Sequence, residues 1–373
     1  MKIHGAVLER SGDNQRPYAD SRPLTVCELD LDAPGPSEVL VRIEAAGICH
    51  SDLSVVDGNR VRPVPMLLGH EAAGIVEEVG DQVSGLDPGT RVVMTFLPRC
   101  GECAGCRTGG IRPCTPGSAA NADGTLMEGG IRLSRGPDRV RHHLGVSAFA
   151  THAVVDHRSI VAIENDVPPV VAALLGCAVL TGGGAVLNAG RPVAGQSVAV
   201  VGLGGVGMAA LITALAVDGI DVIGIDTMAA KLAKAKSLGA SAAYTPSAAA
   251  EAGLKADVVI EAVGSARAFE GAVQMTAAGG TTVTVGLPAP DALSSISPLA
   301  LVAEGRTILG SYLGSAVPSR DIPMFADLWR KGRLPVEELR SSIIPLAEIN
   351  RAMDHLASGE ALRQVIEFDG AGS

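Results

Sequence analysis

The chain has 373 residues, of which 47% are hydrophobic and 19% are charged, and its formal net charge at pH 7 is −10. This length favours two domains over one, and the composition is typical of a globular protein and excludes a disordered one. The acidic balance, with no basic run, argues against a nucleic-acid-binding surface.

Two uncharged runs, at 167–190 and 192–217, have the length of membrane spans. The first contains two prolines and three consecutive glycines, and the second contains a glycine-rich turn, so we interpret both as buried parts of an α/β protein. The N-terminal segment MKIHGAVLER returns to charge too early for a signal peptide. We therefore expect a cytoplasmic protein that does not bind a membrane.

The first 163 residues predict a mostly β domain. Short apolar or alternating runs separated by Gly, Pro and Asp predict strands at 4–8, 24–29, 38–45, 71–79, 91–96, 149–155 and 159–163. The segment 115–141 is polar, glycine-rich and weakly periodic, so we expect a surface loop there.

Seven cysteines lie at positions 27, 49, 100, 103, 106, 114 and 177, and four of them fall between 100 and 114. An odd count with this clustering, in a chain without an export signal, indicates metal binding and not disulfides. The CxxCxxC run with Cys114 eight residues further on favours a structural zinc site with four thiolates. An iron–sulfur ligand run and free thiols are the alternatives, but the iron–sulfur run has proline after its fourth cysteine, and Thr115 stands here.

A helix is predicted from Pro169 to Leu175, interrupted at Gly176-Cys177, with a further short helix over 185–188. The stretch 196–226 then predicts a strand, a turn GLGGVG, a helix, and a second strand that ends in Asp226. Glycines at 202, 204 and 207 suit a turn in which the chain reverses, the backbone approaches a pyrophosphate, and the helix lies close to the strand. Free N–H groups at the helix start would meet the phosphates. The alternative is a glycine-rich turn in a buried core, but the acidic residue that ends the second strand favours a dinucleotide site.

The rest of the chain alternates strands and helices. We expect helices at 228–238 and 268–275 and strands at 242–244, 258–261, 281–286 and 308–312, which together predict a doubly wound parallel sheet. The last sixty residues predict helices at 321–331 and 345–358 and a closing strand at 364–368.

With these motifs in place, the whole chain resembles the zinc-dependent medium-chain alcohol dehydrogenases. Four motifs carry the resemblance: GICHSD (47–52), GHEAAG (69–74), the four-cysteine lobe (100–114) and GLGGVG (202–207), with Cys177 before the last. The resemblance implies an α/β protein with a GroES-like, mostly β catalytic domain formed by 1–178 and 314–373. It also implies a Rossmann NAD-binding domain, a doubly wound parallel sheet, at 179–313.

The resemblance implies two zinc ions per subunit. Cys49, His70 and Cys177 match the family's catalytic ligands. They form a Cys₂His set with an open fourth position, as in alcohol dehydrogenase itself. Glu71 matches an acidic neighbour of that metal, and Asp52 a carboxylate that orients the ligand imidazole. The structural zinc would be held by Cys100, Cys103, Cys106 and Cys114.

The family's reaction is hydride transfer between an alcohol and a nicotinamide, with zinc as the Lewis acid. Ser51 matches the hydroxyl that takes the alcohol proton. Some members have a histidine three residues later that relays this proton, and Ser54 stands at that position here, so we expect a water chain instead.

Asp226 would hydrogen-bond the adenosine ribose and repel a 2′-phosphate, which predicts NAD and not NADP. The residues that the resemblance assigns to the coenzyme are His50, Thr181, Gly202, Gly204, Gly205, Val206, Gly207, Asp226, Lys231, Val263, Val285 and Arg363. Phe96, Leu144, Thr181 and Leu287 match substrate-pocket positions. Arg60 replaces an apolar residue of many members and would either meet an acidic or thiol-conjugate substrate or point to solvent, and we favour solvent.

These residues predict an NAD-dependent dehydrogenase of primary alcohols and aldehydes, including bulky or aromatic ones. A thiol-dependent formaldehyde dehydrogenase, which oxidises an S-hydroxymethyl thiol, shares every motif and is the first alternative. A relative that binds NAD but has lost catalysis is the second. The extra residues between Cys114 and Cys177 match the longer, dimeric members, so we expect a homodimer through strands near 308–312, with a homotetramer as the alternative.

Overall fold

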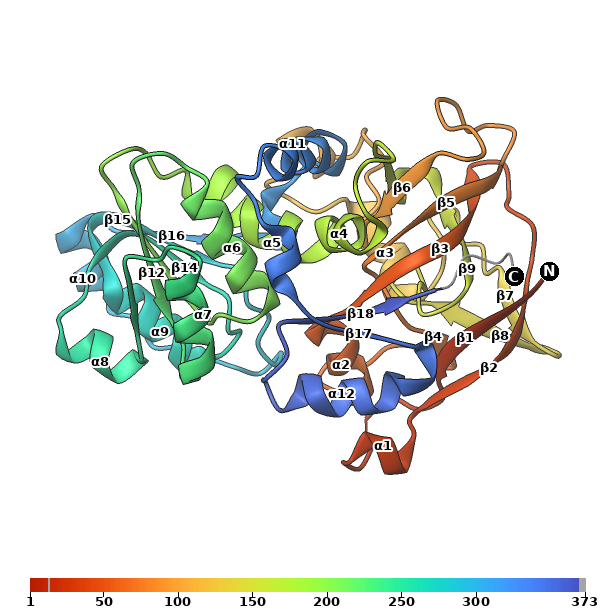
Figure 1. The fold of residues 1–373 in the computed structure, drawn as a ribbon, viewed down its shortest axis with the longest axis horizontal. Coiled ribbons are helices and arrows are strands. Elements are labelled where there is room, and N and C mark those ends of the chain that lie inside the picture. Colours follow the sequence, from red (N-terminus) through yellow and green to blue (C-terminus); the bar gives the residue numbers. More distant parts are fainter. Residues whose placement is uncertain (13, 369–373) are drawn as a thin grey trace. The chain divides into compact units, whose positions relative to one another are not determined.

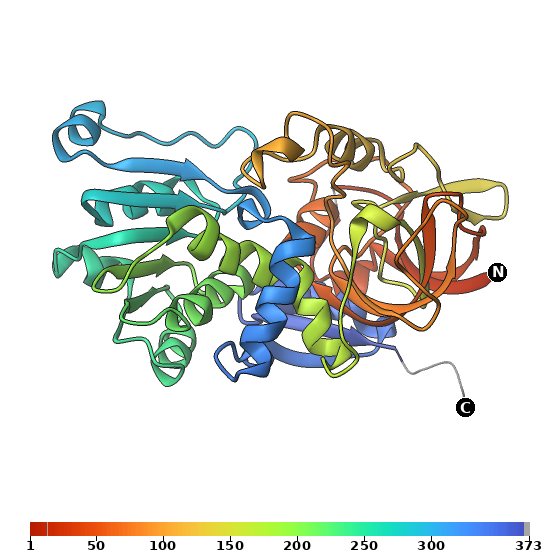
Figure 2. The same cartoon turned by 90° about the horizontal axis from the view of Figure 1, so that it is seen from above.

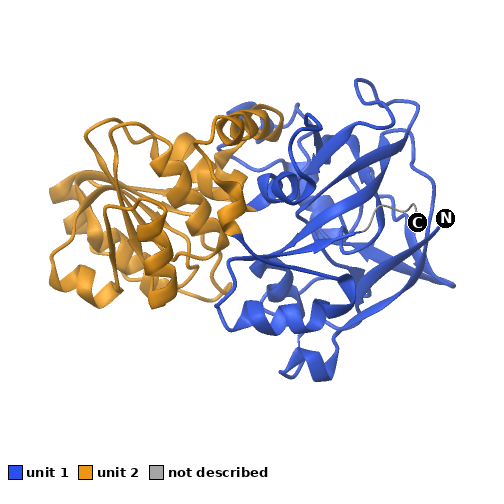
Figure 3. Cartoon of the chain, in the orientation of Figure 1, with its two compact units in different colours: residues 1–177, 340–373 blue, residues 178–339 orange. Residues whose placement is uncertain are grey.

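The structure is a computed structural model that describes residues 1–12 and 14–368. The chain divides into two compact units, unit 1 with residues 1–177 and 340–373 and unit 2 with residues 178–339 (Figure 3). Unit 1 therefore contains both ends of the sequence, and unit 2 is inserted between them.

Unit 1 is built on two β layers (Figure 1). A closed barrel has the strand order β1 (Lys2–Leu8), β2 (Leu24–Leu31), β7 (Leu133–Arg135), β8 (Asp138–His142) and β4 (Met66–Leu67). The second sheet has the order β10 (Ile160–Ala162), β6 (Arg91–Met94), β5 (Ala72–Val79), β3 (Glu38–Ile48), β18 (Arg363–Glu367) and β17 (Arg340–Ile344), with β9 (His152–Asp156) also paired to β3. This mostly β architecture confirms the prediction for the first part of the chain.

The helices of unit 1 are α1 (Tyr18–Ser21), α2 (His50–Val56), α3 (Thr115–Asp123), α4 (Pro169–Leu174) and α12 (Ile349–Ala357). Helix α3 and the β7–β8 hairpin lie within 115–142, so the segment expected to be an excursion or loop over the surface contains regular structure. Proline in the first turn of α3 and a left-handed Gly124 at its end supply start and stop signals that outweigh the weak periodicity. Strand β17, which pairs with β18, was not predicted.

Unit 2 is a six-stranded parallel sheet. Its strand order is β13 (Ala242–Tyr244), β12 (Asp221–Ile225), β11 (Ser197–Val201), β14 (Ala256–Glu261), β15 (Thr276–Thr284) and β16 (Thr307–Gly310). Its helices are α5 (Leu180–Gly184), α6 (Gly205–Leu215), α7 (Ala229–Ser237), α8 (Pro246–Glu251), α9 (Ala266–Met275), α10 (Pro298–Glu304) and α11 (Pro318–Arg330). The order reverses between β11 and β14, which is the position where doubly wound sheets bind ligands. The doubly wound sheet is thus confirmed, and α8 and α10 are additions to the prediction.

The second boundary between the units lies after Leu339 and not at 313/314 as expected. The segment 314–339 packs within unit 2. An ideal Cβ on Gly184 would lie 2.4 Å from the Gly314 carbonyl oxygen, and one on Gly183 would lie 2.6 Å from the Phe325 ring. The Arg333 guanidinium contacts Asp218 at 2.7 Å. These contacts place the segment with the parallel sheet.

The α-helix that begins at Pro169 is interrupted at Gly176-Cys177 as predicted, but the interruption is a π-helical turn and not a break in helical structure. Helical structure continues through π-helical turns at Leu175–Val179 and Ala185–Gly190, on either side of α5. Among the described residues, Pro169–Gly190 is the one helix long and apolar enough to cross a membrane, and 83% of its apolar window is buried inside the protein. That burial is typical of a core helix, in line with the expectation for 167–190.

Strand β16 forms one edge of the parallel sheet, and Figure 2 shows α10 and its connecting loops lying beyond it. Several large apolar side chains of this region are exposed: Leu293 at 88%, Leu299 at 77% and Val302 at 82%. Leu309 on β16 and Tyr312 after it are also partly exposed. Unit 2 therefore presents an apolar surface next to an unpaired strand edge.

Candidate metal centres and dinucleotide-binding turn

The first candidate metal centre begins at the junction of β3 and α2. Cys49 is the N-cap residue of α2, and the Asp52 carboxylate, three residues on, accepts the Cys49 backbone N–H at 2.9 Å. This reciprocal arrangement is a capping box with Asp in the place of Glu. The local sequence Cys-His-Ser-Asp therefore starts a helix and at the same time fixes Cys49 and Asp52 relative to each other.

His70 and Glu71 lie in the connection from β4 to β5 and are almost completely buried. The backbone N–H of Gly47 donates to the Glu71 carbonyl at 2.7 Å. An ideal Cβ on Gly47 would lie 2.6 Å from a Glu71 carboxylate oxygen, so only glycine leaves room for that side chain. The GICHSD and GHEAAG motifs thus pack directly against each other through Gly47 and Glu71.

Cys177 completes a buried cluster of four possible ligands, and it comes from the π-helical turn Leu175–Val179. The ligand atoms of Cys49, His70, Glu71 and Cys177 all lie within 4.8 Å of one another. The Cys177 Sγ lies 3.6 Å from the His70 Nε2. Ligand atoms of a tetrahedral zinc ion lie about 3.3–3.8 Å apart, given its bond lengths, so the spacing fits zinc.

The charges of this cluster also fit a bound cation. A hydrogen bond from the Cys177 thiol outweighs burial and holds the pKa of Cys49 well below its usual value. Burial raises the pKa of Glu71 to about 7, and neither of its carboxylate oxygens has a hydrogen-bond partner among the described residues. Buried, unpartnered carboxylate oxygens beside a thiolate are costly unless a cation or proton neutralises them.

Arg363, the first residue of β18, is the nearest cation and is only 2% exposed. Its Nε lies 3.4 Å from Glu71, and its guanidinium donates to the Cys49 Sγ at 3.4 Å. Burial opposes its charge, but the neighbouring Cys49 and Glu71 raise the pKa of Arg363, which stays protonated. The structure thus places this predicted coenzyme residue against the metal cluster.

Asp52 connects this cluster to a residue that sequence reasoning missed. Its Oδ1 lies 2.9 Å from the His70 Nδ1 and 3.3 Å from the His143 Nδ1. Burial opposes ionisation of Asp52, but both imidazoles outweigh it and lower the pKa of the carboxyl. Burial lowers the pKa of His143, which is therefore neutral. The His142-His143 pair in the sequence was the signal available, but no motif connected it with Asp52.

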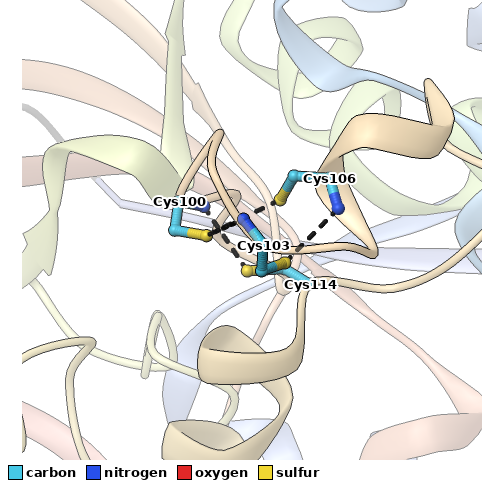
Figure 4. A group of neighbouring side chains, drawn as sticks. All are labelled: Cys100, Cys103, Cys106 and Cys114. Carbon is cyan, nitrogen blue, oxygen red and sulfur yellow. Dashed lines mark hydrogen bonds between the residues drawn. The ribbon is translucent and has the colours of Figure 1, made fainter.

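The second candidate metal centre is the four-cysteine lobe (Figure 4). The Sγ atoms of Cys100, Cys103, Cys106 and Cys114 lie within 4.8 Å of one another. Backbone N–H groups point at the sulfurs: those of Cys103 and Cys106 lie 3.4 and 3.3 Å from the Sγ atoms of Cys100 and Cys103. The bond from the Cys106 N–H is the largest cause that lowers the pKa of Cys103 to about 6, whereas burial raises that of Cys106 to about 12. A tetrahedral S₄ set without an open position fits a structural zinc ion.

The glycine turn of unit 2 has the geometry that its three glycines predict. Gly202 has φ +88°, where only glycine is unstrained. An ideal Cβ on Gly207 would lie 1.7 Å from the Gly202 carbonyl oxygen, so helix α6 lies directly against the turn. A Cβ on Gly204 would meet nothing within 4 Å, which leaves open space at the N-terminus of α6 for a phosphate. The turn therefore fits a dinucleotide.

Asp226 follows β12 and organises this turn. Its carboxylate oxygens accept the backbone N–H groups of Leu203 at 2.7 Å and Met228 at 2.9 Å. Lys231 lies in the first turn of α7 and is half-buried, and Val263 and Val285 lie on the loops after β14 and β15. Thr181 lies in α5, and Gly205 and Val206 begin α6. The predicted coenzyme residues of unit 2 thus lie at the carboxyl ends of its strands and the helices that follow.

The remaining predicted residues belong mostly to unit 1. His50 and Ser51 are the first two residues of α2, and the Ser54 hydroxyl donates to the His50 carbonyl at 2.8 Å. Phe96 packs edge-on against His70 with ring centroids 5.7 Å apart, and Leu144 is buried. Leu287, in unit 2, is half exposed. Arg60 is half-buried, which leaves the predicted orientation toward solvent open, and it makes no ion pair within residues 1–12 and 14–368.

The sheet, the turn and the cysteine clusters define a class of protein, the zinc-binding oxidoreductases that use a nicotinamide dinucleotide. Comparison with known proteins agrees. Residues 35–165 match the family described as alcohol dehydrogenase GroES-like domain, and residues 205–330 match that described as zinc-binding dehydrogenase.

Relatives match over nearly the whole chain. A Mycobacterium tuberculosis protein named as an alcohol dehydrogenase is 36% identical, over 98% of this chain and 100% of the relative. The NDMA-dependent alcohol dehydrogenase of Amycolatopsis methanolica is 34% identical, over 98% and 99%. Among solved structures, benzyl alcohol dehydrogenase from Acinetobacter calcoaceticus has a TM-score of 0.90 with 30% identity, over 99% of this chain and 100% of the other. The chain belongs to the zinc-dependent medium-chain alcohol dehydrogenase family.

Proposed function

We propose that this protein is an NAD-dependent alcohol dehydrogenase that interconverts primary alcohols, including bulky or aromatic ones, and their aldehydes. The single observation that carries the proposal is the buried cluster of Cys49, His70, Glu71 and Cys177, whose ligand atoms lie within 4.8 Å of one another. A relative that had lost catalysis would have no reason to retain an intact Cys₂His set beside a buried carboxylate whose two oxygens have no hydrogen-bond partner among the described residues.

Cys49, His70 and Cys177 would hold the zinc ion, which when bound supplies a Lewis acid that acidifies an alcohol. The glycine turn would hold NAD, which when bound accepts the hydride. Asp52 fixes the His70 ring so that Nε2 faces the cysteines. Arg363 balances the negative charge of Cys49 and Glu71.

Ser51 would take the alcohol proton, since it matches the family's proton-accepting hydroxyl. It lies on α2, two residues after Cys49. The Ser54 hydroxyl already donates to the His50 carbonyl, so its proton is engaged within the helix. We therefore propose that the proton leaves Ser51 through water.

A second candidate, oxidation of an S-hydroxymethyl thiol, is favoured by Arg60. Arg60 as a residue is half-buried and has no ion-pair partner in the described part of the chain, so its charge is available to a carboxylate of a thiol conjugate. One steady-state screen separates the candidates. It compares benzyl alcohol, aliphatic primary and secondary alcohols, and hydroxymethyl thiols, each with NAD, NADP or NDMA as the acceptor.

Turnover of hydroxymethyl thiols above all alcohols would favour the second candidate. Reduction of NDMA without free NAD would show that NDMA, and not free NAD, is the electron acceptor, while the oxidation of the alcohol is as proposed. This arm is included because one relative is named as NDMA-dependent.

The test of the metal mechanism is Cys177→Ala. We expect it to retain one zinc ion per chain, at the four-cysteine lobe, to bind NAD, and to lose turnover. Cys27→Ala is the matched control, because Cys27 lies on β2 and belongs to neither cluster. Undiminished turnover in Cys177→Ala would refute the zinc mechanism.

We also propose a homodimer formed through the β16 edge and the α10 region. The support is the exposure of Leu293, Leu299 and Val302 next to an edge strand, since apolar patches of this kind mark interfaces. Leu299→Asp combined with Val302→Asp should give a monomer in light scattering. Val61→Asp, at an exposed site of unit 1, should not. A homotetramer in the parent protein would correct the proposal, and the cytoplasmic location stays a prediction.

A further inference from the structure

His143 follows β8 directly and faces the same carboxylate oxygen that holds His70. Its Nδ1 lies 3.3 Å from the Asp52 Oδ1, and the His70 Nδ1 lies 2.9 Å from that atom. The two imidazole rings meet edge to face, with centroids 5.4 Å apart and planes at 90°. All three side chains are at most 1% exposed. One buried oxygen is therefore shared by two histidines from distant parts of the sequence.

Asp52 controls the position of two of the metal ligands. Its Oδ2 accepts the Cys49 backbone N–H, and its Oδ1 accepts the His70 ring N–H. A rotation of the carboxylate would therefore disturb both ligands. The Cys49 and His70 contacts alone leave lone pairs of this buried carboxylate without a donor, and the His143 Nδ1 is a further side-chain nitrogen that lies 3.3 Å from it.

The backbone around His143 is held in place by a strained loop. Leu144 and Ser147 have φ values of +53° and +54°, a region that costs energy for residues other than glycine. The His143 N–H donates to the Ser147 hydroxyl at 2.8 Å, and its carbonyl accepts the N–H groups of Val146 and Ser147 at 3.1 and 3.2 Å. Strained backbone persists where its surroundings require it, and it is common near functional sites. The loop thus fixes the backbone of His143, whose Nδ1 lies 3.3 Å from Asp52.

Within the described part of the chain, the Asp52 Oδ1 is the acceptor that faces the His143 Nδ1, at an ion-pair distance of 3.3 Å. The Nδ1 makes no aligned hydrogen bond there, and the ring that lies next to it is that of His70. A role in packing alone would be served by an apolar ring of the same size, without placing a polar nitrogen in a buried site.

We propose that His143 is a positioning residue of the metal centre: together with His70 it holds the Asp52 carboxylate oxygen in place and thereby slows the loss of zinc from Cys49, His70 and Cys177. This proposal rests on the proposed function, which assigns zinc to that cluster. Outer residues that orient a ligand typically change metal affinity 10- to 100-fold when they are replaced.

The test compares two substitutions. His143→Phe keeps an aromatic ring but has no N–H, and His143→Asn places an amide N–H near the position of Nδ1. The readout is the release of zinc to a chelator, followed with a chromophoric zinc indicator on the full-length protein without substrate. The four-cysteine lobe gives an internal control, because its zinc should leave at the same rate in every variant.

We expect two release phases from the parent protein. In His143→Phe one phase should be at least about tenfold faster and the other unchanged, and in His143→Asn both should stay within about threefold of the parent. His142→Gln, which replaces the adjacent buried histidine, should leave both phases unchanged. The steady-state kcat should fall in His143→Phe with little change in the KM for coenzyme.

Parent-like release from His143→Phe would overturn the proposal, and so would equal impairment of the Phe and Asn variants, which would indicate packing alone. If His143→Phe does not fold, His143→Gln replaces it, since its amide reaches the Nε2 position and not Nδ1. A parent protein that binds only the four-cysteine zinc would overturn both the proposed function and this proposal, whereas two release phases in the parent with parent-like release from His143→Phe would overturn this proposal alone.

Discussion

The glycine turn gives the sharpest prediction, because two of its glycines are needed for different physical reasons. An alanine Cβ at position 204 would meet no atom within 4 Å, whereas one at position 207 would lie 1.7 Å from the Gly202 carbonyl oxygen. Gly204 has φ −74°, which alanine adopts without strain. The substitutions Gly204→Ala and Gly207→Ala therefore separate the binding of coenzyme from the packing of α6.

For Gly204→Ala we expect unchanged or slightly higher stability, since replacing a glycine at a compatible site adds about 0.4–1 kcal/mol. Coenzyme affinity should fall, because the methyl group occupies the space left for the phosphate. A hydrogen bond to a charged group contributes about 1.5–3 kcal/mol, so the loss of one contact predicts a Kd about 10- to 150-fold higher.

For Gly207→Ala we expect a loss of stability and a loss of coenzyme affinity. A 1.7 Å approach forces helix α6 away from the turn by more than 1 Å, and such overpacking costs about 1–3 kcal/mol. The only tryptophan, Trp329, lies on α11 in the same unit as the turn. Its fluorescence during urea unfolding therefore reports the stability of unit 2, and titration with NAD, followed by calorimetry, gives the Kd.

Parent-like coenzyme affinity in Gly204→Ala would refute the assignment of that space to the phosphates. Equal stability of the two variants would refute the close approach of α6 to the turn. A matched control is Gly271→Ala, a half-buried position of α9 in the same unit, where a Cβ also meets nothing within 4 Å.

Three further predictions follow from other parts of the structure. Burial lowers the pKa of His142 to about 3, below the unfolded value of about 6.5. The parent should therefore lose about 2 kcal/mol of unfolding free energy at this site between pH 7 and pH 5. Urea unfolding of His142→Gln at both pH values should show a smaller loss, and an equal loss would contradict the lowered pKa of His142. The Asp354 carboxylate accepts the backbone N–H groups of Tyr18 and Ala19 at 2.7 and 2.8 Å. Asp354→Ala should therefore lower the free energy of unfolding by about 2 kcal/mol and speed proteolysis near α1. Asp354→Asn should lower it less. Asp226→Asn removes the charge that would repel a 2′-phosphate, while it keeps an acceptor for the Leu203 N–H. The ratio of kcat/KM for NAD over NADP should fall about tenfold. An unchanged ratio would mean that Asp226 does not discriminate between the two coenzymes at the ribose.

The sequence by itself determined the features whose signals are local. The turn at 202–207 and the lobe at 100–114 could be predicted because backbone sterics at glycine and the close spacing of four thiols act within a few residues. The strands of the parallel sheet were predicted for the same reason, since each is a short apolar run between turn residues. Cys49 and Asp52 share a helix cap, which is also a local device.

Only the tertiary structure decided what depends on contacts between distant segments. Gly176 does not break its helix; an ideal Cβ there would lie 2.1 Å from the Met94 carbonyl oxygen, so close packing and not flexibility requires glycine. Arg363 lies 292 residues from Glu71 in sequence, 363 minus 71, yet it neutralises that carboxylate in a buried site. His143 reaches Asp52 only because the barrel and the loop after β8 bring them together. Burial and charge pairing of this kind arise when the chain closes on itself, and no short window of sequence contains both partners.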